Sequence, residues 1–409
     1  MPEKKISMKK RIIVVCVIAL FSICFLLMTL PLHDDFANAD ATDLREDAHG
    51  MNFVTNPATG KSYLFWSDEY NSGTSSNGNW THDIFYQPIN TSDPRITDKT
   101  VLIKKPEAQE PASVSVTKDG NFFVTFEDGN ATHGHTVAQR YSIYDKELNP
   151  IQKYKTIFLG GHSGHSASTD TKHIVFWSND WISGGGVDNL GTGNDVLVTS
   201  MNSDGSNIKT CKVAVTKKTR DWWPIAAASN DKSLLVWQRY VNKHKYCKLC
   251  YALYDPQSNT LRRINGHKTT VISKMKVKYY TYNVTYLTGI NRYLINVTTA
   301  HNSGVALLLD SNGNISTIKY GLPAFVRESS PAILKKDDSY ILCYPRSPSG
   351  CMYMKVTENK IKYLGLQSGN KWSYRGTSGF FSNKDTYASF ATLTKKAVKL
   401  YKYKALSFL

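Results

Sequence analysis

The 409-residue sequence lacks the patterns of helical, nucleotide-binding and metal-dependent enzymes. After residue 40, no long stretch repeats its apolar residues with the period of an amphipathic helix. The sequence also contains no P-loop, no G-x-G-x-x-G between a strand and a helix, no H-E-x-x-H and no G-x-S-x-G. We therefore expect no cofactor and no metal site.

Charged residues are few, at 20%, whereas aromatic residues reach 12%, with 24 Tyr against 16 Phe. Aromatic and β-branched side chains pack well on a pleated surface, so this composition favours strands. Together with the missing helical periodicity, it predicts an all-β body.

The charges that are present are unbalanced, and the formal net charge is +17. Residues 1–39 contain five Lys or Arg against three Asp or Glu, so +2 of this charge lies there and +15 in the rest of the chain. A basic surface favours anionic partners, such as acidic polysaccharide, lipopolysaccharide, nucleic acid or a membrane face. The alternative is that the charge serves solubility alone.

One long apolar segment lies near the start of the chain. Residues 12–32 are uncharged, a run of 21 that can span a bilayer, and the five basic residues before it orient the N-terminus toward the cytoplasm. Ala37-Asn38-Ala39 then offers an A-x-A site for signal peptidase. Residues 1–39 are thus predicted to be a signal peptide or an uncleaved signal anchor helix in the membrane. Residues 40–409 form the exported body, which is secreted, periplasmic or on the cell surface.

Five of the seven cysteines lie in the body. Cys343 and Cys351 flank a turn-forming segment symmetrically, so a disulfide across a hairpin is geometrically possible. The alternative is two unpaired thiols. Cys247 and Cys250 form a C-x-x-C, but no second pair lies at the spacing that a zinc site needs, so we interpret this motif as structural.

A short pattern recurs along the body: a turn with Gly, Asp or Asn, four apolar or aromatic residues, and a polar residue. The clear quartets are residues 63–66, 123–126, 174–177 and 234–237, and the weaker ones are residues 293–296, 340–343 and 387–390. Their mean spacing of about 54 residues, with other short strands between them, is typical of propeller blades. The sequence predicts a single β-propeller of seven four-stranded blades over residues 40–409, or six if two weak copies merge.

Two stretches, residues 111–145 and 173–205, match a longer pattern best: P-A…D-G-x-Y-L-V-x-W-x-D…D-I-Y-x-Q-R-Y-D. In this they resemble the extracellular propeller repeats of bacterial surface and secreted proteins. The resemblance implies architecture and not activity, because such repeats occur in lectins, glycosidases, lyases and adhesive scaffolds.

In a propeller, the loops before the innermost strands converge on the mouth of the central channel, where ligands commonly bind. The residues at these positions are rich in charged, His and aromatic side chains. We expect ligand binding by Arg45, His49, Arg220, Trp222, Trp223, Arg327, Trp372 and Arg375, and the candidates for catalysis are Glu110, His162, His165, Asp221, Glu328 and Tyr374.

These residue types suit an anionic glycan. Arg forks bind carboxylate or sulfate, and aromatic faces stack on sugar rings and on cations. Paired carboxylates can cleave a glycosidic bond, and a His or Tyr beside an Arg-bound uronate can abstract a proton. The alternative is that these groups pair with one another and hold the blades together.

The leading prediction is therefore an exported, lectin-like protein that recognises an anionic glycan or another acidic surface polymer at the channel mouth. One alternative is an enzyme at the same place, a glycosidase, a sialidase-like enzyme or a uronate lyase. The F-R-I-P start and the S-x-D-x-G-x-T-W box of sialidases are both absent. A second alternative is a protein-interaction scaffold, and no specific nucleic acid recognition is expected.

Overall fold

The computed structural model of the chain describes residues 49–69, 82–129, 137–179, 195–216, 219–241, 246–372, 376–394 and 397–405. The chain divides into two units, Met1–Asp43 and Leu44–Leu409, and all described residues belong to the second. The predicted signal or anchor segment, residues 12–32, therefore lies outside the described residues. Within the described ranges, no helix is long and apolar enough to cross a membrane.

The first part of the body consists of three four-stranded antiparallel sheets. Their strands, in sheet order, are β1 (His49–Thr55), β2 (Ser62–Glu69), β3 (His82–Ile89) and β4 (Thr100–Ile103); β5 (Gln109–Val116), β6 (Phe122–Asp128), β7 (Ala138–Tyr144) and β8 (Pro150–Leu159); and β9 (His162–Ser168), β10 (Lys172–Ser178), β11 (Val196–Asn202) and β12 (Lys209–Ala214). Each sheet is built from strands that follow one another in the chain, so its hydrogen-bond partners are all local.

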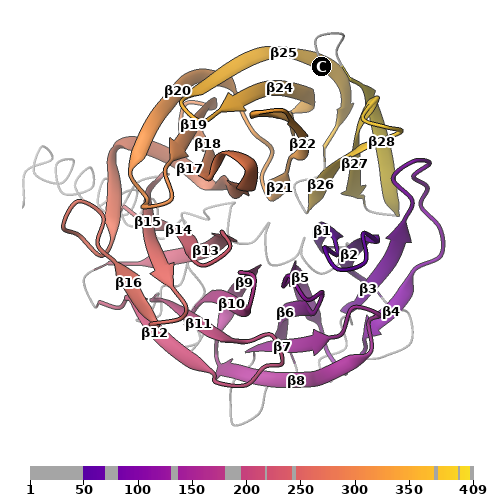
Figure 1. Ribbon diagram of the computed structural model, residues 1–409, viewed down its shortest axis with the longest axis vertical. Coiled ribbons are helices and arrows are strands. Elements are labelled where there is room, and N and C mark those ends of the chain that lie inside the picture. Colours follow the sequence, from indigo (N-terminus) through magenta and orange to yellow (C-terminus); the bar gives the residue numbers. More distant parts are fainter. Residues whose placement is uncertain are drawn as a thin grey trace, which may run out of the picture. The chain divides into compact units, whose positions relative to one another are not determined.

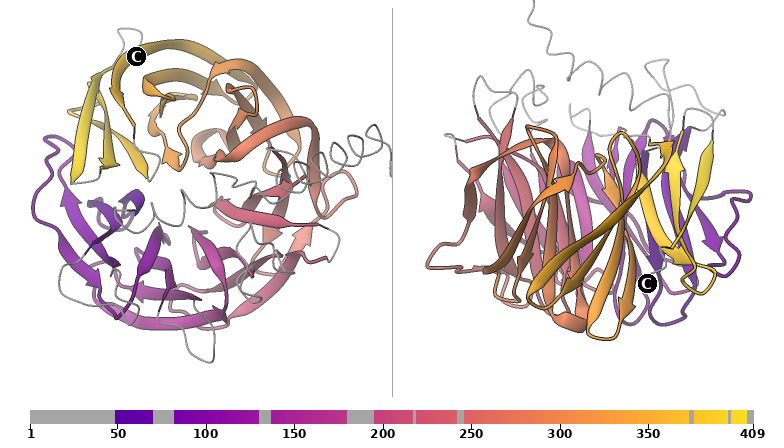
Figure 2. Two further views of the ribbon diagram at one scale, coloured as in Figure 1. Left: turned by 180° about the vertical axis from the view of Figure 1, so that it is seen from behind. Right: turned by 90° about the horizontal axis from the view of Figure 1, so that it is seen from above.

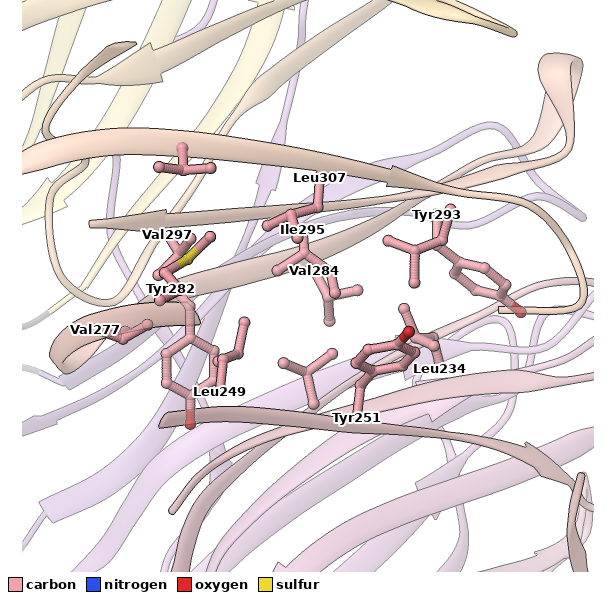
Figure 3. Close-up of a cluster of buried hydrophobic side chains, with 14 of the residues drawn as sticks. Leu234, Leu249, Tyr251, Val277, Tyr282, Val284, Tyr293, Ile295, Val297 and Leu307 are labelled. Atoms are coloured by element: carbon pink, nitrogen blue, oxygen red, sulfur yellow. The ribbon is translucent and has the colours of Figure 1, made fainter. Parts of the chain in front are cut away.

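The next sheet has eight strands and joins two such units through one long strand. Its elements are β13 (Asp221–Ala228), β14 (Ser233–Tyr240), β15 (Cys247–Asp255), β16 (Thr260–Arg262), β17 (Thr270–Leu287), β18 (Arg292–Thr299), β19 (Ser303–Leu309) and β20 (Ile315–Pro323), with a 3₁₀ helix, η2 (Thr288–Ile290), after β17. The start of β17 pairs with β15, and its end pairs with β18. A buried cluster that includes Leu249, Val277 and Ile295 fills the space between these strands (Figure 3).

Two further sheets complete the described chain. They contain β22 (Ala332–Lys336), β23 (Ser339–Pro345), β24 (Ser349–Thr357) and β25 (Lys360–Lys371), and then β21 (Ser329–Ser330), β26 (Thr377–Ser382), β27 (Tyr387–Leu393) and β28 (Val398–Lys404). The short β21 pairs with β26 in parallel, whereas the other pairs in these two sheets are antiparallel.

The sheets of this unit surround a common centre, and the chain passes from one to the next until the last sheet lies beside the first (Figures 1 and 2). At that closure, the Phe53 ring of β1 stacks on the Phe380 ring of β26 with centroids 4.4 Å apart. The Phe53 amide also donates to the Ser378 hydroxyl at 2.9 Å. The all-β prediction is confirmed, and the arrangement is consistent with a β-propeller.

The recurring quartets identify equivalent strands. Six lie in the second strand of a unit, β2, β6, β10, β14, β18 and β23, and the seventh lies in β27, the second of the three antiparallel strands of the last sheet. Adjacent sheets pack against both faces of these strands: in β10, Phe176 lies in a cluster with Trp237 of β14, and Val175 lies in a cluster with Phe123 of β6. Near-continuous apolar runs result. Trp66, Trp177 and Trp237, at the fourth position of three quartets, are among the largest fully buried side chains.

The predicted disulfide is absent from the described structure, in which Cys343 and Cys351 are both free and buried. The hairpin register places Cys343 opposite Tyr353 and Cys351 opposite Pro345, so the two cysteines are diagonal neighbours. The turn is centred one residue later than their symmetric spacing suggested. Burial, followed by the neighbouring Cys351 thiol, raises the pKa of Cys343 well above its usual range, so this thiol stays protonated at neutral pH.

Candidate binding site in the central cavity

The innermost strand of each of the first four sheets carries a β-bulge near its start. At each bulge, the inner strand advances by three residues while the paired neighbouring strand advances by two. The bulges lie between residues 49 and 52, 110 and 113, 162 and 165, and 222 and 225. A bulge inserts an extra residue and re-aims the side chains that follow it. The same local irregularity thus recurs around the centre of the body.

Several residues at these strand starts have a left-handed backbone. Gly50 has a φ of 68°, and the equivalent Ser163 and Trp223 have φ values of 51° and 54°. Tyr280 in the next unit (60°) and Glu328 just before β21 (50°) share this conformation. It costs an L-residue other than Gly roughly 1–2 kcal/mol, and such residues cluster at functional sites.

A cavity of about 250 Å³ lies where these inner strands meet. Its lining comes from Gly50, Met51, Asn52, Phe53, Pro111, Ala112, Ser113, Val114, His165, Trp223, Ile225, Tyr282, Asn283, Glu328, Ser329, Ser330 and Ser378. The lining thus combines aromatic rings with hydroxyl and amide groups, and it includes one His and one carboxylate. The candidates His165, Trp223 and Glu328 all belong to it.

Small polar side chains join neighbouring inner strands around this cavity. The Asn52 amide donates to the Ala112 carbonyl at 2.9 Å, which links the first two sheets. The Ser113 and Ser166 hydroxyls lie 3.1 Å apart and link the second sheet to the third. The Ser330 and Ser378 hydroxyls form a similar pair at 2.8 Å. These bonds hold the cavity wall in place.

One side of the cavity is aromatic and charged. The Trp223 ring lies edge-on to His165 and Tyr280, with centroids 5.7 and 4.9 Å apart. The Arg327 guanidinium sits 4.4 Å from the centre of the Tyr280 ring, within the range of a cation–π contact. Arg327 Nε also donates to Glu328 Oε1 at 2.8 Å, so the carboxylate in the cavity wall is paired with an arginine beside it.

The protonation of His165 follows from its partner. Its Nδ1 lies 3.2 Å from the Ser163 carbonyl oxygen, which can only accept a hydrogen bond. Nδ1 therefore carries a proton, and in the neutral ring Nε2 is the acceptor nitrogen. The nearby Tyr282 hydroxyl donates to the Trp223 carbonyl, and burial raises its pKa well above the usual range. Tyr282 is thus protonated and committed to holding Trp223.

Asp221 lies outside the cavity lining, in a fully buried position. It accepts from Trp237 Nε1 at 2.6 Å, from Arg239 Nε at 2.7 Å and from the Thr219 hydroxyl at 2.6 Å. A buried carboxylate with this many donors is ordinarily structural. We interpret Asp221 as a structural residue whose hydrogen bonds hold β13 and β14 together.

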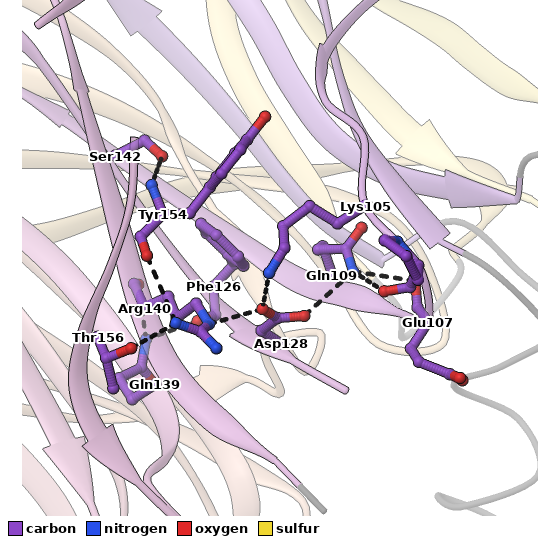
Figure 4. A network of polar contacts seen from close by, with 11 residues as sticks. Lys105, Glu107, Gln109, Phe126, Asp128, Gln139, Arg140, Ser142, Tyr154 and Thr156 are labelled. Carbon is purple, nitrogen blue, oxygen red and sulfur yellow. Dashed lines mark hydrogen bonds and ion pairs between the residues drawn. The ribbon is translucent and has the colours of Figure 1, made fainter. Parts of the chain in front are cut away.

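Glu110 is likewise engaged with a neighbour, because its carboxylate is hydrogen-bonded to Nδ1 of His82 at the start of β3. Beside it, the buried Asp128 pairs with Lys105 and with Arg140, whose Nε lies 2.6 Å away, and it also accepts from Gln109 at 3.3 Å (Figure 4). These charges connect the first two sheets. Here the alternative interpretation, in which polar groups pair and hold the blades together, describes the contacts best.

The remaining candidates are distributed more widely. Trp222 is buried in a core cluster, and Arg220 is half-buried and absent from the cavity lining. Trp372 packs against Phe390 and donates from Nε1 to the Gly350 carbonyl at 2.6 Å. Arg45, Tyr374 and Arg375 lie outside the described residues, as do the side chains of His49 and His162, the first residues of β1 and β9. In the described ranges, no three His, Cys, Asp or Glu residues gather closely enough to hold a metal ion.

Sequence reasoning missed much of the lining, including Asn52, Ser113, Tyr282 and Ser378. The predicted residues lie just before or at the start of each inner strand, whereas the lining runs through each bulge and just beyond it, as in residues 50–53 and 111–114. These positions could have been recognised in the sequence by a small polar residue, Asn or Ser, shortly after the start of the innermost strand of several units.

The left-handed position of Ser163 leads to a stability prediction. Its hydroxyl is buried without a hydrogen-bond partner among the described residues, and its φ is 51°. Ser163→Gly is expected to raise the free energy of unfolding by about 1 kcal/mol, because glycine adopts this φ without strain and the buried hydroxyl is removed. The measurement is urea unfolding.

The matched control is the reverse exchange at the equivalent position of the first sheet. Gly50→Ser is expected to destabilise, because a Cβ there would lie 2.7 Å from the Ala112 carbonyl oxygen. A Ser163→Gly variant less stable than the unsubstituted protein would mean that the bulge geometry described above is wrong.

No family model and no curated protein matches the sequence. Its fold resembles that of a bacterial lectin. The BP39L lectin from Burkholderia pseudomallei superimposes with a TM-score of 0.54 over 86% of this chain and 97% of that chain, at 11% sequence identity. An ulvan lyase bound to a GlcA–Rha3S oligosaccharide gives 0.48 over 87% of this chain and 94% of that chain, at 10% identity. At such low identity, the similarity to the lectin concerns the fold alone.

Proposed function

We propose that the protein is a glycan-binding protein that holds one sugar ring in the central cavity. The observation that carries this proposal is the lining: the Trp223 and Phe53 rings beside hydroxyl and amide groups from several inner strands. A sugar has apolar C–H faces and a rim of hydroxyls, so it needs both kinds of contact. The volume of about 250 Å³ is slightly below the roughly 300–1,000 Å³ of pockets for drug-sized ligands, which suits a single ring.

Binding fits the cavity better than hydrolysis does. A glycosidase needs two carboxyl groups about 5–9.5 Å apart, and Glu328 is the sole carboxylate among the described lining residues. For a lyase, Tyr282 is a poor base because its hydroxyl stays protonated and bonded to the Trp223 carbonyl. The fold is compatible with glycan binding, since the BP39L protein is a lectin.

We further propose that the propeller has seven blades and that the preferred glycan is anionic. The seven blades rest on the seven strands that carry the quartets and on the division of the eight-stranded sheet at β17. The anionic preference rests on the net charge of +17 and on Arg327 beside the cavity.

Export rests on the apolar residues 12–32 and the A-x-A site. Sequencing the mature N-terminus distinguishes cleavage after Ala39 from retention of an anchor.

A glycan array probed with the full-length protein tests the proposed function. We expect binding to saccharides that carry uronate or sulfate, and no release of reducing ends or of unsaturated uronate after prolonged incubation. Release of either product would establish the enzyme alternative in its place. Absence of binding to any glycan would contradict the proposal and leave the scaffold alternative.

A further inference from the structure

We propose that the long strand β17 extends the cavity into a track for an acidic polysaccharide, formed by Lys274, Lys276 and Lys278 and by the tyrosines that follow them. This inference rests on the proposed function, and it turns a site for one sugar ring into a site for a polymer. The track runs from the outer part of the β13–β15 unit to the cavity wall.

The lysine segment of β17 lies at the cavity end of the sheets. Val277, in its middle, pairs with Cys247 at the start of β15 and with Thr299 at the end of β18. The inner strand β13 also begins at this end, because each strand reverses direction relative to the one before it. Residues 274–278 therefore cross from one unit to the next at the same end of the sheets as the start of β13, which contributes Trp223 to the cavity.

The three lysines share one exposed face. They alternate with Met275 and Val277, which are buried in the core cluster shown in Figure 3. Alternate residues of a strand lie about 6.6–6.8 Å apart on the same side, so the ammonium groups form a row. None of the three has an ion-pair partner among the described residues. Lys276 Nζ lies 4.9 Å from the centre of the Tyr246 ring, and Lys278 Nζ donates to the Asn302 amide oxygen at 3.2 Å.

Lysines often protect an exposed sheet edge against pairing with other chains. At Val277, in the middle of the row, β17 pairs with β15 on one side and with β18 on the other, so this position is not an outer sheet edge, whereas the pairing is irregular before and after it. Three like charges in a row repel one another, and an anionic polymer laid along them would relieve this repulsion.

A series of aromatic rings, which begins directly after Lys278 in the chain, reaches the cavity. The Tyr279 ring lies 5.1 Å from Tyr240 and 6.1 Å from Tyr280, and Tyr280 lies 4.9 Å from Trp223. Arg327 covers the Tyr280 ring at 4.4 Å. From Lys278 toward the cavity, the groups are thus an ammonium, tyrosine rings and the Arg327 guanidinium. Such alternating cationic and aromatic groups suit a chain of sugar rings that carry carboxylates or sulfates.

Buried Gln238 holds this aromatic series in position. Its Nε2 donates to the Tyr240 hydroxyl at 2.9 Å, and its Oε1 accepts from the Tyr280 amide at 3.0 Å. The Tyr240 and Tyr280 hydroxyls are 3.3 Å apart. Because a fully buried side chain fixes both tyrosines, the track is formed before any ligand binds, which lowers the entropic cost of binding.

The test compares a short and a long acidic saccharide by calorimetry, with glucuronate and a heparin octasaccharide as the probes. In the full-length triple variant Lys274→Gln, Lys276→Gln and Lys278→Gln, the affinity for the octasaccharide is expected to fall about tenfold, on the scale of three exposed charge contacts. The affinity for glucuronate is expected to stay unchanged, because one ring occupies only the cavity.

The matched control removes three exposed lysines at the opposite end of the sheets, by Lys355→Gln, Lys360→Gln and Lys362→Gln. This variant has the same change in net charge and is expected to bind the octasaccharide like the unsubstituted protein. An equal loss in both triple variants, or no loss in the β17 variant, would overturn the track. If the unsubstituted protein bound the octasaccharide but not glucuronate, the result would count against the cavity as a site for one ring. The proposed function and the proposed track can therefore fail separately.

Two further probes separate the polymer classes. Single-stranded oligonucleotides and vesicles with anionic lipid are expected to bind more weakly than the octasaccharide, and to lose no more affinity in the β17 variant than in the control. Either probe binding more tightly than the octasaccharide through the same lysines would overturn the assignment to a polysaccharide.

Discussion

Replacing Asp221 with alanine is expected to lower the free energy of unfolding by about 3–5 kcal/mol. The Asp221 carboxylate is fully buried and accepts from Trp237 at 2.6 Å and from two nitrogens of Arg239 at 2.7 and 3.1 Å. Its removal leaves the arginine charge and the indole N–H without their acceptor inside the protein. Urea unfolding followed by fluorescence measures the loss.

The control for Asp221→Ala is the same substitution at an exposed aspartate that pairs with a lysine. Asp231 pairs with Lys232 at 2.7 Å, and its side chain is 65% exposed, so Asp231→Ala is expected to cost less than about 1 kcal/mol. An Asp221→Ala protein that unfolds like the unsubstituted one but no longer binds glycan would contradict the structural interpretation and return Asp221 to the site.

Replacing Trp223 with alanine is expected to weaken glycan binding at least about 100-fold, the size of effect typical of a buried aromatic hot spot. The ring forms the aromatic wall of the cavity and contacts both His165 and Tyr280. Its loss also opens a void and is expected to destabilise the fold by about 3 kcal/mol. Calorimetry below the melting temperature separates the loss of affinity from the loss of stability.

Trp372→Ala is the matched control for this prediction. Trp372 also packs in an aromatic cluster, against Phe390, Tyr401 and Tyr403, but it is absent from the cavity lining. The variant is expected to lose stability and keep its affinity for glycan. Equal losses of affinity in both tryptophan variants would mean that binding depends on overall stability and not on the cavity.

The architecture was accessible from the sequence because the second strand of each unit is covered on both faces. Near-continuous apolar quartets such as residues 174–177 are required there, and they recur even where the other strands have diverged. The weak quartet at residues 293–296 still marks β18, although its last residue is Asn296, whose amide donates to the Tyr344 hydroxyl. A buried polar residue is tolerated where it finds a partner in the neighbouring unit.

The site was only partly accessible. His165, Trp223 and Glu328 were candidates because their chemistry is distinctive, and all three line the cavity, whose binding role remains a proposal. Asp221 has equally distinctive chemistry, yet its pairing with Arg239 depends on the register of β13 with β14, which single-sequence patterns do not reveal. The bulges were also hidden, because left-handed positions are usually recognised by glycine, and here Ser163 and Trp223 occupy them.

The central claim, that the cavity among the inner strands binds a sugar ring, is tested most directly by the crystal structure of the protein soaked with the saccharide that the array selects. We expect density for one ring between Trp223, His165 and Glu328, with any further acidic rings continuing over Tyr280 toward Lys278. Density on the outer strands or at the opposite end of the sheets, with the cavity empty, would contradict it.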